Sequence, residues 1–216
     1  MRIVTWNVAG KWRTGHQDLL HALDADVLLL TEVPIEGALE GYHQHTSRAS
    51  MAGSTKKWAA VFARSELTPL PDPHPASAAA VVGGATVISS IMPWPRAGTL
   101  WPWGSPDHTE RMAETASAVL ETVVPGETIW GGDWNTPLTG NLSGFARASQ
   151  AALLDALNGQ PFQVPTKDLL AKSDLQSSID HIAVPDSWET LHAERVRTDT
   201  LSDHDAYWIE VLPHPS

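Results

Sequence analysis

The sequence predicts an α/β sandwich built on β-sheet, formed by one domain that spans residues 1–216. Segments with the pattern of buried strands alternate with segments of helical periodicity along the whole chain, and no repeat or low-complexity tract interrupts them. Of the 216 residues, 42% are hydrophobic, which is enough for one well-packed core, and the chain is short for two. We therefore expect one functional site.

Strands are predicted where apolar or β-branched residues form short runs. The run Val27-Leu28-Leu29-Leu30 is continuously apolar, which is typical of a strand buried on both faces, and it ends at Thr31-Glu32. The predicted strands cover residues 1–6, 27–30, 58–63, 86–92, 128–130, 179–184 and 206–212. Prolines on alternate positions between Pro69 and Pro75 indicate an extended surface loop.

Helices are predicted where apolar residues recur at helical spacing. The predicted helices cover residues 18–23, 109–124 and 147–157. In the second of them, Met112, Ala116 and Val119 follow the helical period. Asp107 is the expected N-cap, because its carboxylate can accept from the free N–H groups of the first turn, and Pro125-Gly126 is the expected stop.

The composition excludes some classes of site and partner. The chain has no cysteine, so any metal must be held by oxygen or imidazole ligands. A formal net charge of −11 argues against tight non-specific nucleic-acid binding, which needs clustered Lys and Arg, although a carboxylate metal site would itself add negative charge. The first residues form no apolar stretch suited to a signal peptide or membrane span, so we expect a cytoplasmic monomer without a membrane partner.

Polar clusters stand at the ends of the predicted strands. They are Thr5-Trp6-Asn7, Thr31-Glu32, Gly131-Gly132-Asp133-Trp134-Asn135, Ser178-Ile179-Asp180-His181 and Ser202-Asp203-His204. Strand ends in one sheet share an edge, so residues far apart in sequence can converge there. Oxygen ligands gathered in this way can surround a metal ion and a phosphate.

These motifs, in this order and over nearly the whole chain, resemble those of the endonuclease/exonuclease/phosphatase superfamily, whose fold is DNase I-like. Each motif alone is common by chance, but five in the right order are specific. The resemblance implies two facing β-sheets flanked by helices, in four layers α/β/β/α. It also implies a metal-dependent hydrolase that cleaves a phosphodiester, as a nuclease does, or a phosphomonoester.

The resemblance assigns the metal and the attacking water to particular residues. Glu32 and Asp203 would bind Mg²⁺ or Mn²⁺ with Asn7 assisting, and carboxylates suit these ions as hard oxygen donors. Asp133 would activate the water and Asn135 would orient it. In an extended segment these two side chains, two residues apart, leave the same face of the chain.

His204 and Asp180 would stabilise the charge that develops on the phosphate. Asp180 would orient the His204 imidazole and stabilise its protonated form, whereas His181 is expected to be structural. Any one of these polar residues could instead cap a turn or helix. The functional interpretation is preferred because capping does not require this order at successive strand ends.

The chain departs from the family pattern at two positions. Thr31 stands where Gln commonly precedes the metal-binding Glu. The mid-chain strand usually ends in a His or Asn that contacts the phosphate, and here the matching stretch runs from Ser89 to Pro93. Ser90 or Ser89 could substitute as a hydrogen-bond donor, but Ile91 could not. The alternative is therefore a catalytically weak or inactive member of the fold that binds a ligand or partner.

Tryptophans follow that strand in a proline-containing loop. Trp94, Trp101 and Trp103 lie there, and we expect the loop to form a wall of the substrate cleft, with Trp101 and Trp103 in contact with substrate. A satellite core under the loop is the alternative. The substrate would be a phosphate ester, with nucleic acid among the open choices. His74 has no metal-ligand partner at useful spacing and is expected at the surface.

Overall fold

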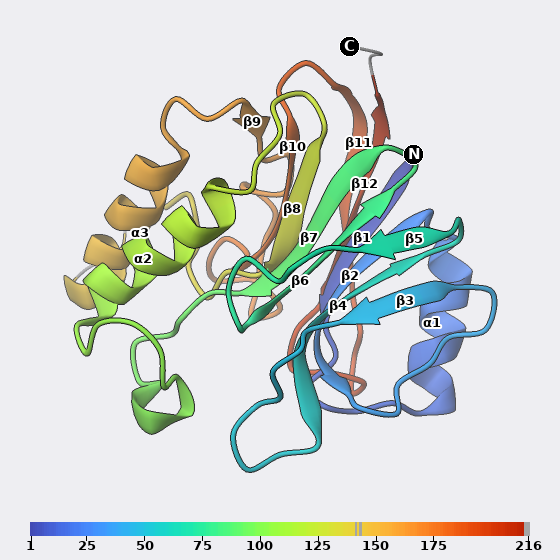
Figure 1. Cartoon of the computed structure of the whole chain (residues 1–216), viewed down its shortest axis with the longest axis horizontal. Helices are drawn as coiled ribbons and strands as arrows, with labels where there is room; N and C mark the ends of the chain where they lie inside the picture. The colour runs from blue at the N-terminus through green and yellow to red at the C-terminus, as the bar shows by residue number, and fades with distance from the viewer. Residues whose placement is uncertain (141, 143, 214–216) are drawn as a thin grey trace.

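The computed structural model describes residues 1–140, 142 and 144–213 and consists of two six-stranded sheets packed face to face (Figure 1). The first sheet runs in the order β11 (Glu189–Val196), β12 (Ala206–Leu212), β1 (Arg2–Asn7), β2 (Val27–Pro34), β4 (Lys56–Ala63) and β3 (His43–Thr46). The second runs in the order β5 (Leu67–Pro69), β6 (Ser77–Val82), β7 (Ala85–Ile91), β8 (Thr128–Asp133), β10 (Asp180–Pro185) and β9 (Phe162–Gln163).

Helices cover the two outer faces. Figure 1 shows α1 (Thr14–Leu23) beside the first sheet, and α2 (His108–Leu120) and α3 (Gly144–Leu157) beside the second. The layers are thus α/β/β/α, and the DNase I-like sandwich expected from the sequence is confirmed. Within the described ranges, none of the helices combines the length and apolar character needed to cross a membrane.

The apolar run of β2 is buried on both faces, as its sequence predicts. Val27 and Leu29 join the core between the sheets, whereas Leu28 and Leu30 pack with Leu20 of α1 on the outer face. Side chains of a strand alternate between faces, so a strand with helix on one side and sheet on the other must be apolar throughout. Each fully buried leucine contributes about 1.5 to 3 kcal/mol to this packing.

The second sheet is covered by an amphipathic helix whose start is set by a cap. Met112, Ala116 and Val119 of α2 pack on the outer face of the second sheet, against residues that include Trp130. The Asp107 carboxylate accepts from the backbone N–H of Glu110 at 2.9 Å, so the predicted cap is present.

The sequence pattern missed five strands, which are β3, β5, β6, β9 and β11. β6 reads Ser-Ala-Ala-Ala-Val-Val, and alanine has low strand propensity. It is a strand because it pairs with β7 along its whole length, from Ser77 opposite Ser90 to Val82 opposite Ala85. β11 is an edge strand without a fully buried residue, so it carries little apolar signal.

Candidate active site

Strand ends from both sheets converge on one point. Asp133 ends β8 and Asp180 begins β10, and the two residues are direct partners across the antiparallel pair. Asn7 ends β1 in the facing sheet, and its amide Nδ2 donates to the Asp133 Oδ2 at 3.0 Å. Polar residues that are up to 173 positions apart in sequence therefore meet at a common edge, as expected.

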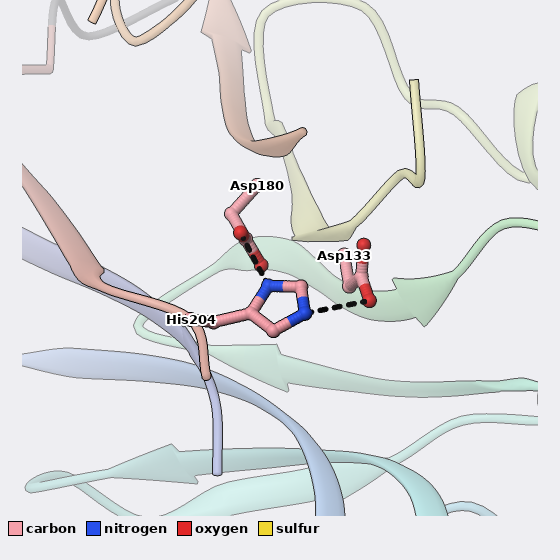
Figure 2. Close-up of side chains that lie close together, drawn as sticks. All are labelled: Asp133, Asp180 and His204. Carbon is pink, nitrogen blue, oxygen red and sulfur yellow. Dashed lines mark hydrogen bonds and ion pairs between the residues drawn. The ribbon is translucent and has the colours of Figure 1, made fainter. Parts of the chain in front are cut away.

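His204 lies between the two carboxylates (Figure 2). Its Nδ1 is 2.8 Å from the Asp180 Oδ2, and its Nε2 is 3.9 Å from the Asp133 Oδ2. The side chains of Asp133, Asp180 and His204 are 5%, 4% and 17% exposed, so little water separates these charges. The hydrogen bond expected between Asp180 and His204 is thus present.

The surrounding charges shift the pKa values of both His204 and Asp133. Burial by itself lowers the pKa of His204, but the charges of Asp180 and Asp133 outweigh burial and raise this pKa to about 10. Burial raises the pKa of Asp133, and the nearby Asp180 charge adds to that, whereas His204 opposes it. His204 is therefore a cation at neutral pH, next to a carboxylate that accepts a proton more readily than an ordinary aspartate.

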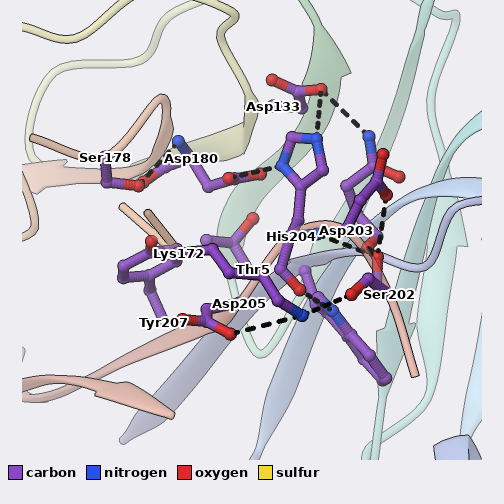
Figure 3. Close-up of polar contacts among 12 residues, drawn as sticks. Thr5, Asp133, Lys172, Ser178, Asp180, Ser202, Asp203, His204, Asp205 and Tyr207 are labelled. Atoms are coloured by element: carbon purple, nitrogen blue, oxygen red, sulfur yellow. Dashed lines mark hydrogen bonds and ion pairs between the residues drawn. The ribbon is translucent and has the colours of Figure 1, made fainter. Parts of the chain in front are cut away.

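The loop that carries His204 is anchored to β1 by hydrogen bonds (Figure 3). The Ser202 hydroxyl donates to the Asn7 carbonyl at 2.7 Å and accepts from the His204 backbone N–H at 3.2 Å. The indole N–H of Trp6 donates to the His204 carbonyl at 3.2 Å, and Lys172 donates to the Ser202 carbonyl. These contacts tie the backbone on both sides of Asp203 to β1 and to Lys172.

Asn7 presents its amide nitrogen to the carboxylates. Its Oδ1 accepts from the Ala9 backbone N–H at 2.9 Å, and its Nδ2 donates to the Glu32 Oε1 at 3.2 Å and to Asp133. An amide nitrogen that donates in this way is not a metal ligand. In this orientation Asn7 bridges the two carboxylates, and its assistance to the metal stays a prediction.

Glu32 occupies a strained position within β2. Its φ of 54° is in the left-handed region, which costs a non-glycine residue on the order of 1 to 3 kcal/mol and is concentrated at functional sites. The Gly10 backbone N–H donates to the Glu32 carbonyl at 3.0 Å, and the Lys56 ammonium forms an ion pair with the Glu32 carboxylate. Lys56 was not predicted from the sequence as a site residue. It lies two residues before Trp58, so both side chains leave the same face of β4, and this spacing could have indicated it.

The ligand atoms of Asp133, Asp180 and His204 lie close enough together to hold a metal ion. Among the residues that the structure describes, the ligand atoms of Asp133, Asp180 and His204 lie within 4.8 Å of one another. Metal binding requires a neutral imidazole, and the raised pKa of His204 opposes that. This group is therefore better suited to acid–base chemistry.

Hard oxygen donors outside that group fit a divalent cation. The Glu32 carboxylate is 23% exposed and already attracts one cation, the Lys56 ammonium. Asp203 is exposed beside His204, and its Oδ1 accepts from the Ser202 hydroxyl at 3.4 Å. Glu32 and Asp203 do not join a tight cluster of three ligand side chains in the described part of the chain. Their chemistry suits Mg²⁺ or Mn²⁺, and their pairing stays a prediction.

Asn135 reaches the site through a turn. β8 ends at Asp133, and Asn135 has a left-handed φ of 51°, so the extended geometry expected for this segment is wrong. The Asn135 backbone N–H donates to the Asp133 Oδ1 at 3.0 Å, and its Nδ2 donates to the Met92 carbonyl at 2.9 Å. An Asx-type turn therefore directs the side chain, which still lines the pocket.

A pocket of about 350 Å³ lies over these residues, and its lining contains both polar and apolar side chains. Its polar lining consists of Glu32, Ser54, Lys56, Asp133, Asn135 and His204. Its apolar lining consists of Met51, Ala52, Trp58, Ile91, Trp94 and Leu100. A ligand in this pocket would therefore meet charged groups and apolar side chains together.

The substrate contact expected of Ser90 is wrong. Ser90 is fully buried, and its hydroxyl accepts from the Trp130 indole N–H at 2.7 Å, on the face of β7 that is covered by helices. Ile91, one residue further along, lies opposite Asp133 in the parallel pair and lines the pocket. Alternation along the strand explains this, since neighbouring side chains leave opposite faces.

The substrate contacts expected of Trp101 and Trp103 are also not found. Trp101 is 2% exposed and packs with Trp58, and neither Trp101 nor Trp103 lines the pocket. The ring centroids of Trp58 lie 5.2 Å from Trp101 and 5.4 Å from Trp103, so the satellite core is the correct alternative for these two. Trp94 from the same loop does line the pocket.

Histidines outside the carboxylate cluster have structural surroundings. His74 is partly buried: it stacks on Trp101 with a centroid distance of 5.3 Å, and burial lowers its pKa to about 4. His181 is fully buried, its Nε2 donates to the Thr136 carbonyl at 3.1 Å, and burial lowers its pKa to about 4. The structural role expected of His181 agrees with these contacts.

A family model described as the Endonuclease/Exonuclease/phosphatase family matches residues 4–204 of this chain. No curated protein sequence matches it. Among solved structures, the chain is similar to the endonuclease domain of TRAS1, a telomere-specific non-LTR retrotransposon, with 17% identity, 96% of each chain covered and a TM-score of 0.67.

Similar structures include both nucleases and a phosphatase. An AP endonuclease from Archaeoglobus fulgidus is 14% identical, with 97% of this chain and 98% of that chain covered and a TM-score of 0.68. A mannosyl-6-phosphatase from Bacteroides thetaiotaomicron is 16% identical, with 98% and 99% covered and a TM-score of 0.65. At these identities the likeness shows the fold and does not select a substrate.

Proposed function

We propose that this chain, which belongs to the endonuclease/exonuclease/phosphatase family, uses a divalent metal ion to hydrolyse a small phosphate ester. Members of this family are hydrolases that act on phosphoester bonds. The observation that carries the proposal is His204 held between Asp180 and Asp133 at the floor of a pocket that also contains Glu32. Capping or turn formation alone would not require this arrangement of charges.

Each polar residue has a chemical task in this proposal. Glu32 and Asp203 would hold the Mg²⁺ or Mn²⁺ ion, which supplies neutralisation of the phosphate charge. Asp133 would accept the proton of the attacking water, since its raised pKa makes it a stronger base than an ordinary aspartate, and Asn135 would orient that water. His204 would donate to a phosphoryl oxygen as negative charge develops there.

Asp180 would act through His204 and not on the substrate. It accepts from the imidazole Nδ1, which keeps the Nε2 directed towards Asp133 and the pocket. Its buried charge also favours the imidazolium form. Loss of this carboxylate would therefore weaken both the orientation and the charge of His204.

The pocket favours a compact substrate with an apolar group. A volume of about 350 Å³ accommodates a small ester, and Trp94, Leu100 and Met51 offer apolar contact next to the charged residues. The formal net charge of −11 opposes a long polyanion. We therefore favour a phosphate ester with an aromatic or aliphatic substituent over a nucleic-acid duplex.

One observation favours the alternative of a weak or inactive member that binds a ligand. Ile91 lines the pocket at the end of the strand where His or Asn is usual in the family, so one polar contact to the phosphate is missing. This alternative predicts binding of phosphate esters with slow or absent turnover. A hydrolysis assay separates this ligand-binding alternative from an active enzyme.

The decisive experiment is a substrate panel in Mg²⁺ and in Mn²⁺. The panel contains an aryl phosphomonoester, an aryl phosphodiester, inositol phosphates, single-stranded and duplex DNA, abasic DNA and RNA. We expect fastest hydrolysis of a small aryl ester, with none in EDTA and none by Asp133→Asn. Faster cleavage of duplex DNA would refute the small-ester assignment, and no hydrolysis of any substrate would refute the enzyme.

Metal binding is tested separately by thermal melts. A ligand that binds only the native state at 100 times its Kd raises stability by about 2.7 kcal/mol. We expect Mn²⁺ to raise the Tm of the wild type and of Glu36→Ala, whose side chain is exposed on the same segment, but not of Glu32→Ala. If Mn²⁺ raises the Tm of all three proteins equally, Glu32 is not a metal ligand.

A further inference from the structure

Among the described residues that line the pocket, Lys56 is the only lysine or arginine. Its ammonium forms an ion pair with the Glu32 carboxylate, whose other oxygen accepts from Asn7 at 3.2 Å. The Lys56 and Glu32 side chains are 28% and 23% exposed, so the pair lies at the mouth of the site and not in its core. Without a metal ion, Lys56 thus neutralises the carboxylate predicted to bind one.

The position of Lys56 is set by close packing on the loop that follows β1. A Cβ atom added at Gly10 would collide with the Lys56 stem, and Gly10 has a φ of +70°, which favours glycine. The Gly10 backbone N–H also donates to the Glu32 carbonyl. One loop therefore holds the lysine stem and the backbone of its carboxylate partner together.

The next residue provides a contrast. Lys57 leaves the opposite face of β4, and its ammonium donates to the Arg48 carbonyl in a groove away from the pocket. The two lysines share a strand, a charge and a side-chain length. They differ in that Lys56 faces Glu32 and Lys57 does not.

A phosphate in the pocket would lack one polar partner on the β7 side, because Ile91 lies there. An ammonium group is a compact charge with three donors on a flexible stem, which suits a phosphoryl oxygen. With its stem packed on Gly10, Lys56 can turn its terminal ammonium from Glu32 towards the pocket, which the side chain already lines. It would thereby supply the contact that the end of β7 does not.

We propose that Lys56 has two alternative partners: Glu32 in the metal-free protein, and a phosphoryl oxygen of the substrate when Glu32 binds a divalent ion. This inference rests on the proposed function. It makes Lys56 a substrate-contacting residue whose charge opposes metal binding and assists phosphate binding. Removal of that charge must then change the two affinities in opposite directions.

The test is calorimetry on the full chain with two probes, Mn²⁺ alone and inorganic phosphate in saturating Mn²⁺. In Lys56→Met we expect about tenfold tighter Mn²⁺ binding, because a competing cation is removed, and about tenfold weaker phosphate binding, each about 1.4 kcal/mol. Lys57→Met should match the wild type in both titrations. Lys56→Arg keeps the charge and should retain phosphate binding within about threefold.

Two outcomes would overturn the inference. If Lys56→Met behaves as Lys57→Met does with both probes, Lys56 contacts neither ligand. If both affinities weaken together, Lys56 only supports the local fold, and Lys56→Gln, which keeps a polar contact to Glu32, should then bind both ligands normally. Neither titration requires turnover, so opposite changes in a protein that hydrolyses nothing would refute the proposed catalysis and retain the role of Lys56.

Discussion

His204 lines the pocket, whereas His74 packs on two tryptophans that do not, and the surroundings of the two imidazoles have opposite effects on their charge. His204 sits between Asp180 and Asp133, and its pKa is raised to about 10. His74 stacks on Trp101, and burial lowers its pKa to about 4. Burial alone lowers the pKa of both imidazoles, and only His204 has buried carboxylates near enough to reverse that.

This contrast separates two regions of the molecule. The acidic region, formed by Asp133, Asp180 and His204, gathers charges that cost free energy to bury, and we propose that these charges serve catalysis. The tryptophan cluster, formed by Trp58, Trp101 and Trp103 with His74, buries large rings against one another. We expect substitutions in the acidic region to affect turnover and those in the tryptophan cluster to affect stability.

The largest effect is expected for Asp133→Asn. Loss of the general base should lower kcat on the order of 10³- to 10⁴-fold, because an amide cannot accept the proton. The fold should persist, since the substitution keeps the shape and removes a buried charge. Steady-state kinetics and thermal melts measure the two effects, with Asp168→Asn at an exposed position as the control. A variant that keeps its activity would show that another group activates the water.

Trp101→Ala should produce the largest loss of stability. Truncation of a buried tryptophan leaves a cavity and costs about 3 to 5 kcal/mol. The free energy of unfolding from urea titration measures this loss. KM and kcat at a temperature where the variant is folded should stay close to those of the wild type, because Trp101 does not line the pocket. A raised KM without a loss of stability would reverse the assignment of this residue to the tryptophan cluster.

Trp94→Ala is expected to have a smaller effect than Trp101→Ala, and to weaken substrate binding rather than the stability of the fold. Trp94 is partly exposed and lines the pocket, so its loss removes an aromatic contact of about 1 to 3 kcal/mol to a substrate ring. KM for an aryl phosphate ester should rise, while KM for an ester without an apolar group changes less. Equal changes for both esters would indicate that Trp94 shapes the pocket without contacting the substrate.

The smallest effect is expected in the pH dependence of stability. His74 has a folded-state pKa below its unfolded value of 6.5. Its contribution to the free energy of unfolding is therefore present above pH 6.5 and is lost as the pH falls towards 4. His204 has a raised pKa, so its contribution is fully present below pH 6.5 and is lost as the pH rises towards 10.

Thermal melts in EDTA from pH 4 to pH 8 measure the effect of His74. The Tm of His74→Phe, which keeps the ring on Trp101, should fall less steeply than the wild-type Tm as the pH drops below about 6.5. His181 titrates equally in both proteins and cancels in the difference. Parallel curves would mean that His74 is not held neutral by the tryptophan cluster.

The order of the polar motifs was sufficient to predict the convergence of Asp133, Asp180 and His204. Each lies at or next to the end of a strand whose apolar pattern is readable, and strand ends of packed sheets meet at an edge. The continuous apolar run of β2 likewise predicted a strand buried on both faces. These features depend on local periodicity, which a sequence carries directly.

Which face a side chain occupies was decided only by the tertiary structure. Ser90 and Ile91 differ by one position, and that step moves the side chain from the helix-covered face to the pocket. The loop with Trp94 and Trp101 has no period from which to predict which ring is buried. The pair of Lys56 with Glu32 joins two strands, and this contact depends on how β2 and β4 pair. Local sequence determines strands and their ends, whereas register, turns and long-range packing determine which atoms meet.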